Sequence, residues 1–168
     1  CRMTNAPFQA RDPYDWPALL ALIQSEFAYM EGRIDPPSSM HLLTADSIAA
    51  QAKSGEVWVI EDQNIPVACV FLTPKQGALY VGKLAVAQSW RGQGLARLLL
   101  QTAETRAHAL GLPVLELQTR VELLENHAAF VRMGFVKTGD SAHPGYAQAT
   151  SITMQKQVSA HSARNIAQ

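Results

Sequence analysis

A glycine-rich turn lies just past the middle of the chain, where the sequence reads Val86-Ala87-Gln88-Ser89-Trp90-Arg91-Gly92-Gln93-Gly94-Leu95-Ala96-Arg97. An apolar run of strand character precedes the turn, and leucines at helical spacing follow it. The first backbone N–H groups of a helix have no partner inside the helix, and the positive end of the helix dipole lies beside them. A diphosphate fits such a place, and glycine lets the backbone approach it closely. The turn therefore predicts a phosphate-binding loop between a strand and a helix.

The same residues also fit an ordinary turn before a helix, because glycine is common in turns. Two familiar nucleotide-binding motifs do not fit. A dinucleotide fingerprint needs a third glycine where Arg97 stands, and a P-loop needs a Gly-Lys-Ser or Gly-Lys-Thr ending, which is absent. A loop that holds a diphosphate through its backbone stays open beside the ordinary turn.

Hydrophobic periodicity predicts the elements around this turn. Asp12-Pro13 is expected to start the first helix, as an acidic N-cap followed by proline, and Thr44 or Asp46 to cap the second. The long helix follows the glycine-rich turn, and a short helix is expected from about 126 to 133. Strands are expected at 8–11, 57–60, 66–72, 78–86, 114–119, 135–138 and 150–154, with a hairpin at Gln63-Asn64.

The strand–helix–strand unit from Ala78 to Thr119 makes its two strands parallel, whereas the hairpins are antiparallel. The expected fold class is therefore α/β, with a mixed sheet of about seven strands flanked by about four helices. One domain is expected over residues 1–157, and a flexible tail over 158–168, where the sequence turns small and polar.

Composition excludes several classes of protein. The 168 residues are 48% hydrophobic and 17% charged, which is typical of a globular domain. Fourteen basic residues balance fourteen acidic ones, so a nucleic-acid partner is not expected. No apolar run is long enough to cross a membrane, and no secretory signal is visible. The two cysteines, Cys1 and Cys69, make a disulfide framework implausible, so a cytoplasmic location is expected. The five histidines are scattered, and no metal is expected.

Three stretches together resemble the GNAT superfamily of N-acetyltransferases. Arg91-x-x-Gly94-x-Ala96 resembles the superfamily's Arg/Gln-x-x-Gly-x-Gly/Ala signature, and Lys83-Leu84-Ala85-Val86 resembles its fourth strand. The stretch 125–135, which ends in Gly134-Phe135, resembles its closing helix. The resemblance covers roughly residues 8–157. It implies the acyl-CoA N-acyltransferase fold and transfer of an acetyl group from acetyl-CoA to an amine.

The resemblance also implies a set of cofactor-binding residues. The fourth and fifth strands would splay apart, and the backbone of Leu84 and Val86, with Ala85 between them, would pair with the pantetheine arm. Asn126 would contact the arm from the other side, although it also fits a plain helix N-cap. Phe130 would pack nearby, although a core aromatic is the simpler interpretation. The pyrophosphate would be held by Arg91, Gly92, Gln93, Gly94, Leu95 and Ala96.

The chain departs from the superfamily pattern at the two proton-transfer positions. Phe130 stands where many members carry the tyrosine that protonates the leaving thiolate, and Tyr80 stands where some carry a glutamate base. Three other residues are candidates for catalysis: Tyr146 before the last strand, Glu116 on the fifth strand, and Glu31 after the first helix. Each also fits a role without catalysis: Tyr146 as a surface tyrosine, Glu116 as a solvated strand residue and Glu31 as a charge at a helix end.

The acceptor side is acidic. Residues 11–35 contain five acidic and two basic residues, a net charge of −3, which would attract a cationic amine. The Pro36-Pro37 loop suggests a closed pocket, so the expected acceptor is a primary amine of a small molecule. Two alternatives stay open: a non-catalytic acyl-CoA-binding or sensor module, and an acetyltransferase that acts on protein lysines or N-termini. A homodimer is also compatible with the resemblance.

Overall fold

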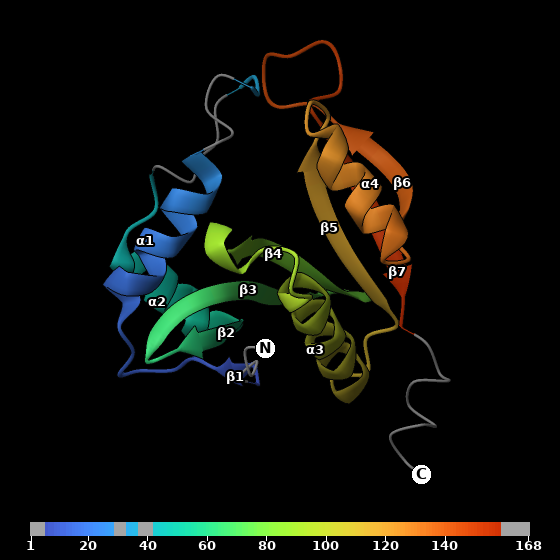
Figure 1. Cartoon of the computed structure of the whole chain (residues 1–168). Coiled ribbons are helices and arrows are strands. Elements are labelled where there is room, and N and C mark those ends of the chain that lie inside the picture. The colour runs from blue at the N-terminus through green and yellow to red at the C-terminus, as the bar shows by residue number, and fades with distance from the viewer. Residues whose placement is uncertain (1–5, 29–32, 37–41, 159–168) are drawn as a thin grey trace. The chain divides into compact units, whose positions relative to one another are not determined.

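The computed structural model of the chain describes residues 6–28, 33–36 and 42–158. Within these residues, seven strands form one sheet in the order β1-β2-β3-β4-β5-β7-β6 (Figure 1). The strands are β1 Phe8–Gln9, β2 Glu56–Asp62, β3 Ile65–Lys75, β4 Ala78–Val86, β5 Val114–Arg120, β6 Val136–Ser141 and β7 Ser151–Gln157. The helices are α1 Trp16–Phe27, α2 Ala45–Ser54, α3 Leu95–Ala109 and α4 Leu124–Arg132, with a short 3-10 helix, η3, over Gln88–Trp90.

The strand pairing is mixed, as the sequence predicts. β1 with β2, β2 with β3, β5 with β7, and β6 with β7 all pair antiparallel. β4 and β5 pair parallel, with Leu79 opposite Leu115 and Tyr80 opposite Glu116. Gln63 and Asn64, both with positive φ, make the predicted hairpin turn between β2 and β3. The predicted α/β fold with a mixed sheet is confirmed.

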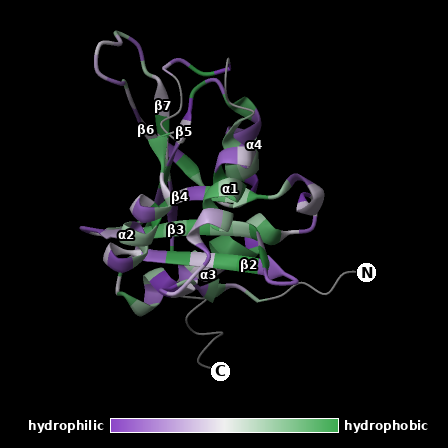
Figure 2. Ribbon diagram, turned by 90° about the vertical axis from the view of Figure 1, so that its left-hand side faces the viewer, coloured by the Kyte–Doolittle hydropathy of each residue, from purple (hydrophilic) through white to green (hydrophobic). Residues whose placement is uncertain are grey.

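The chain divides into two compact units, which are described separately. The first consists of Cys1–Tyr29, Ser39–Thr73 and Val81–Thr102. Its core lies where α1 and α2 pack on one face of β2 and β3, and Figure 2 shows the hydrophobic character of both strands. The fully buried members include Leu19 and Ile23 of α1, Ile48 of α2 and Val59 of β2. Burial of each such side chain stabilises the fold by about 1.5–3 kcal/mol.

The second unit consists of Met30–Ser38, Pro74–Tyr80 and Ala103–Gln168. On β5, Leu115, Leu117 and Thr119 are buried, and the alternate residues lie on the other face of the strand. The register with β7 places Glu116 opposite Gln155 and Gln118 opposite Thr153. The polar side chains of Glu116 and Gln118 therefore lie on the face of β5 opposite to the buried one, next to polar residues of β7.

The predicted start of the first helix is wrong. α1 begins at Trp16, and its N-cap is Asp15, whose side chain accepts a hydrogen bond from the backbone N–H of Ala18. Asp12 instead accepts a hydrogen bond from the indole N–H of Trp16 at 2.6 Å. Asp12 is followed directly by Pro13, and Asp15 is followed by Pro17 after one residue, so the sequence offers two similar start signals. The start at Asp15 agrees with the burial of Trp16 and Leu19.

The other boundaries agree with the prediction to within a few residues. β4 covers the predicted 78–86, and Thr44 is the N-cap of α2, in a capping box with Ser47. The predicted helix at 126–133 begins two residues earlier, at Leu124. No helix within the described residues is long and apolar enough to cross a membrane. A single domain over 1–157 stays a prediction, and most of the predicted tail, residues 159–168, lies outside the described residues.

Candidate active site

The glycine-rich turn has the predicted setting between a strand and a helix. After β4, η3 buries Trp90, and the loop then runs through Arg91, Gly92, Gln93 and Gly94 to the first residue of α3. Gly92 and Gly94 have φ values of 79° and 82°, a backbone conformation that residues with a Cβ rarely adopt. Leu95 follows at once and is buried. The buried residues on either side fix the loop, and the two glycines allow its sharp course.

The mouth of α3 is open on the side of the glycines. Residues 91–94 are all exposed, and a Cβ built on Gly92 or Gly94 would meet no heavy atom within 4 Å. The helical hydrogen bonds begin with the N–H of Leu98, which donates to the carbonyl of Gly94. The N–H groups of the first turn, from Leu95 to Arg97, therefore have no acceptor inside the helix. Backbone donors, exposure and the helix dipole together fit an anionic diphosphate.

Arg91 begins the signature, and its guanidinium is bound to α1. Its Nη2 lies 2.6 Å from Oε1 of Glu26, the penultimate residue of that helix. Glu26 is only 10% exposed in its side chain, whereas Arg91 is 54% exposed. Glu26 is one of the five acidic residues between positions 11 and 35, and the structure gives its carboxylate a basic partner. The pair ties the loop to the first helix.

The end of β4 carries the three residues expected beside the pantetheine arm. Ala85 is buried, and Leu84 and Val86 are partly exposed. Just before them, Lys83 has a positive φ of 48° inside the strand, so the backbone departs from regular pleating there. The Lys83 Nζ donates to Oε1 of Gln51 at 3.0 Å and lies 5.2 Å from the centre of the Phe71 ring. Burial lowers the pKa of this lysine. The alternating pattern of the sequence gives no sign of this irregularity.

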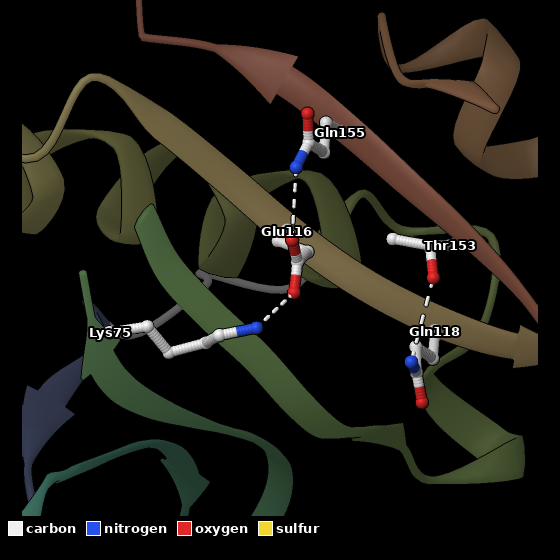
Figure 3. A network of polar contacts seen from close by, with 5 residues as sticks. All are labelled: Lys75, Glu116, Gln118, Thr153 and Gln155. Atoms are coloured by element: carbon white, nitrogen blue, oxygen red, sulfur yellow. Dashed lines mark hydrogen bonds and ion pairs between the residues drawn. The ribbon is translucent and has the colours of Figure 1, made fainter. Parts of the chain in front are cut away.

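In the second unit, Glu116 is held by two partners (Figure 3). Lys75, the last residue of β3, forms an ion pair with Oε2, and the side-chain amide of Gln155 donates to Oε1 at 2.9 Å. The hydrogen bonds from Lys75 and Gln155 lower the pKa of Glu116, against the opposing effect of burial. The alternation of β5 predicts that Glu116 points away from Leu115 and Leu117, and this is confirmed. Its two partners come from distant segments and were not foreseen.

Tyr146 lies in the loop between β6 and β7 and binds the segment 33–36. Its hydroxyl donates to Oδ1 of Asp35 at 2.5 Å. This hydrogen bond is the main cause that raises the pKa of Tyr146, with smaller effects from burial and from the charge of Asp35. The phenol therefore stays protonated throughout the neutral range, as a general acid requires.

Three further polar contacts hold the same segment. Arg120 donates to the carbonyl of Pro36 at 2.7 Å, and the backbone N–H of Asp35 donates to Oε2 of Glu122 at 3.1 Å. Arg33 forms an ion pair with Glu125, with 2.7 Å between Nη2 and Oε2. Arg120, the last residue of β5, and Glu122, just after it, therefore both contact this segment.

Two of the candidate residues lie on α4. Asn126 is the third residue of the helix, and the N-cap is Leu123, so the interpretation of Asn126 as an N-cap is wrong. Phe130 is half-buried and packs edge-to-face on Phe135, with 5.7 Å between ring centroids. This contact agrees with a packing aromatic. Their contacts with a coenzyme stay predictions.

The remaining predicted residue, Glu31, lies outside the described residues, and its role stays a prediction. The structure also adds two residues that sequence reasoning missed, Lys75 and Gln155. A weak signal in the sequence could have identified Gln155. Antiparallel pairing of the fifth and last strands would have placed a polar residue of the last strand opposite Glu116.

Comparison with known proteins assigns the family. The model of the acetyltransferase (GNAT) family matches residues 16–135, which include the signature loop, β4 and α4. The matched range is well over half of the 168 residues. The chain belongs to the acetyltransferase (GNAT) family.

Solved structures of that family share the fold. The PaiA N-acetyltransferase from Thermoplasma acidophilum, in complex with coenzyme A, superposes with a TM-score of 0.78 at 9% identity, covering 93% of this chain and 99% of that one. A GNAT family acetyltransferase from Elizabethkingia anophelis with acetyl-CoA bound gives 0.66 at 17%, covering 90% and 97%. The ribosomal-protein-S18-alanine N-acetyltransferase from Escherichia coli gives 0.69 at 17%, covering 94% and 95%. At these identities the likeness concerns the fold.

Proposed function

We propose that this protein transfers the acetyl group of acetyl-CoA to a primary amine of a small molecule. The observation that carries the proposal is the open mouth of α3. The exposed loop from Arg91 to Gly94 leaves the first-turn N–H groups of the helix without helical acceptors, and the loop lies within the residues that the family model matches. Two of the similar structures contain coenzyme A or acetyl-CoA, which supports the same ligand here.

The residues of the first unit would bind the coenzyme. The loop and first turn, Arg91 to Ala96, would donate backbone hydrogen bonds to the diphosphate, and the backbone of Leu84, Ala85 and Val86 would pair with the pantetheine arm. A backbone N–H near Val86 would stabilise the oxyanion of the tetrahedral intermediate. Asn126 and Phe130 are proposed as further contacts of the arm. When bound, acetyl-CoA supplies a thioester that an amine can attack.

Two residues are proposed for proton transfer. The attacking amine must lose a proton, and the leaving thiolate must gain one. Glu116 is the proposed base, because it is a carboxylate of lowered pKa and stays ionised at neutral pH. Tyr146 is the proposed acid, because its raised pKa keeps the proton on the hydroxyl. Glu31 stays a candidate for a second carboxylate near the acceptor.

A buried carboxylate oxygen next to segment 33–36 supports a cationic acceptor. Oε1 of Glu122 is buried and has no hydrogen-bond partner, and among the described residues only Oγ1 of Thr119 shares this condition. A buried carboxylate oxygen without a partner is costly, and an ammonium group would satisfy it. The backbone N–H of Asp35 donates to the other oxygen of Glu122, and the Asp35 carboxylate, which accepts a hydrogen bond from Tyr146, adds a second negative charge on this segment. Both acids favour an acceptor that carries more than one amine.

The two alternatives differ in what they predict. A non-catalytic acyl-CoA-binding module would bind acetyl-CoA without releasing coenzyme A, and an enzyme of protein lysines or N-termini would prefer peptides. The E. coli neighbour acetylates a protein alanine, but at 17% identity it supports only the fold. A homodimer and a cytoplasmic location stay predictions.

The test is release of the coenzyme A thiol with three sets of acceptors: diamines and polyamines, amino acids, and peptides with a free N-terminus or lysine. The proposal expects the highest kcat/KM for a small amine of charge +2 or more. Preference for peptides by tenfold or more would favour the protein acetyltransferase. A rise in Tm with acetyl-CoA, without thiol release for any acceptor, would favour the binding module.

A further inference from the structure

We propose that Lys75 is a positioning residue for Glu116. Together with Gln155 it fixes the Glu116 carboxylate beside Tyr80, so that β5 provides the base that this chain lacks at its usual position on β4. The inference rests on the proposed function, because it assigns how the proposed base is held. Neither Lys75 nor Gln155 stands out in the sequence, and the contacts in the structure carry the inference.

The geometry of the carboxylate is the first step. Each oxygen of Glu116 receives one donor: Oε2 the ammonium of Lys75, and Oε1 the amide of Gln155 at 2.9 Å (Figure 3). The two partners come from opposite sides, one from the end of β3 and one from β7. A carboxylate oxygen has two lone pairs, so each oxygen keeps one that can accept a proton. The side chain is held in one orientation and still has capacity as a base.

The position of Tyr80 is the second step. Tyr80 and Glu116 are direct partners in the parallel pairing of β4 and β5, so their side chains leave the sheet on the same face. Tyr80 is the residue that stands where some relatives carry a glutamate base. The Glu116 carboxylate therefore lies on the strand next to Tyr80, at the same level of the sheet.

Lys75 also contacts Tyr80, which is the third step. Its Nζ lies 5.5 Å from the centre of the Tyr80 ring, a distance at which the ring attracts a cation. Burial, with the charge of Glu116, raises the pKa of Tyr80, against a hydrogen bond from the backbone N–H of Gln118. Tyr80 thus stays neutral, and Lys75 is the charged group that faces Glu116. One ammonium orders both side chains.

Because Glu116 is largely buried, its two hydrogen-bond donors affect its protonation state. The Glu116 side chain is 13% exposed, and that of Lys75 is 46% exposed. Burial alone would favour the protonated carboxyl, yet the two donors outweigh it. Without the ammonium, burial is expected to raise the pKa of Glu116 and to release its orientation. A purely structural ion pair would change stability in the same variant, but it would leave the pH dependence of catalysis unchanged.

The experiment compares Lys75→Met, which keeps an unbranched side chain without the charge, with Lys75→Arg, which keeps the charge. Lys137→Met is the matched control, because Lys137 forms an exposed ion pair with Asp140 in the same unit. Two quantities are measured in each protein: the pKa of the Glu116 carboxyl by carbon-13 NMR, assigned by its loss in Glu116→Gln, and kcat/KM against pH. The best amine of the acceptor panel is used throughout, so its own titration is common to all variants.

In Lys75→Met, we expect the pKa of Glu116 to rise, the acidic limb of kcat/KM to move to higher pH with it, and kcat to fall by about tenfold. The KM for acetyl-CoA should stay within about twofold, since coenzyme contacts are untouched. Lys75→Arg should restore the limb, and Lys137→Met should match the wild type. An unchanged pKa of Glu116, or a raised pKa with unchanged kinetics, would overturn the inference. Absence of acetyl transfer by the wild-type protein would instead overturn the proposed function, which the NMR titration does not need.

Discussion

Glu26 and Arg91 form an ion pair of 2.6 Å between residues 65 positions apart in the sequence. The carboxylate is nearly buried at the end of α1, and the guanidinium belongs to the first residue of the signature loop. The arginine of the signature therefore reaches toward a helix of its own unit. In the proposed complex, this arrangement leaves the diphosphate chiefly to the backbone N–H groups of the loop and of α3, with the arginine holding the loop in place.

This arrangement predicts that Arg91→Ala and Glu26→Gln weaken acetyl-CoA binding by a similar factor. Loss of one partly buried ion pair costs about 1 kcal/mol, which is about fivefold in Kd. The double variant should be no worse than the weaker single variant, because both changes remove the same interaction. Calorimetric titration of the four proteins with acetyl-CoA gives the complete cycle. A loss in Arg91→Ala that greatly exceeds the loss in Glu26→Gln would mean that the guanidinium binds the phosphates directly.

The loop itself is tested by Gly94→Glu. The new side chain would place bulk and negative charge at the mouth of α3, so the rise in Tm with acetyl-CoA should disappear. For the wild type, ligand at a hundredfold excess over Kd stabilises the protein by about 2.7 kcal/mol. Gly94 has a φ of 82°, so any side chain there also costs about 1–2 kcal/mol in backbone strain.

Gly77→Glu is the matched control for that strain. Gly77 lies in the turn between β3 and β4, has a φ of 78°, and a Cβ there also meets nothing within 4 Å. Its variant should lose a similar amount of stability and keep the full ligand-induced rise in Tm. If acetyl-CoA still stabilises Gly94→Glu as it does Gly77→Glu, the loop is not the diphosphate site.

The sequence predicted local features better than contacts between distant segments. β4 and the glycine-rich turn were predicted because their signals lie within a few neighbouring residues. The start of α1 was misplaced because Asp12 and Asp15 both precede a proline, and only the burial of Trp16 separates them. The ion pair of Lys75 with Glu116 joins residues 41 positions apart, and no periodicity encodes such a meeting. The partners of the candidate base therefore required the fold.

Cys69 is predicted to be inert in the folded protein. It is fully buried in β3, and burial raises the pKa of its thiol to about 12. Only the thiolate reacts with an alkylating reagent, and a raised pKa keeps the thiol protonated until strongly alkaline pH. Iodoacetamide at pH 8 should therefore leave the Cys69 peptide unmodified in native protein and modify it in urea, as read by mass spectrometry. Fast labelling of the native protein would show that β3 opens readily.

Tyr146→Phe tests the proposed general acid. The change removes the hydroxyl that donates to Asp35, and kcat should fall by about a hundredfold if the hydroxyl protonates the thiolate. Tyr14→Phe is the control, because it removes a similar hydrogen bond, from Tyr14 to Glu61 at 2.5 Å, in the first unit, where Tyr14 is partly buried against the core. That variant should lose stability and keep kcat. Equal kcat losses in both variants would assign the effect to folding.

Phe130→Tyr, combined with Tyr146→Phe, separates a missing proton donor from a displaced loop. Phe130 stands where many members of the superfamily carry the donor tyrosine, and its side chain is half-buried and packs edge-to-face on Phe135. If Tyr146→Phe lacks only a proton donor, Phe130→Tyr should restore kcat by about tenfold in the double variant, and a leaving group of lower pKa should reduce the difference between the proteins. If Tyr146 instead acts by holding Asp35 and segment 33–36, the second tyrosine cannot replace it. The defect would then appear as a raised KM for the amine, which Phe130→Tyr leaves in place.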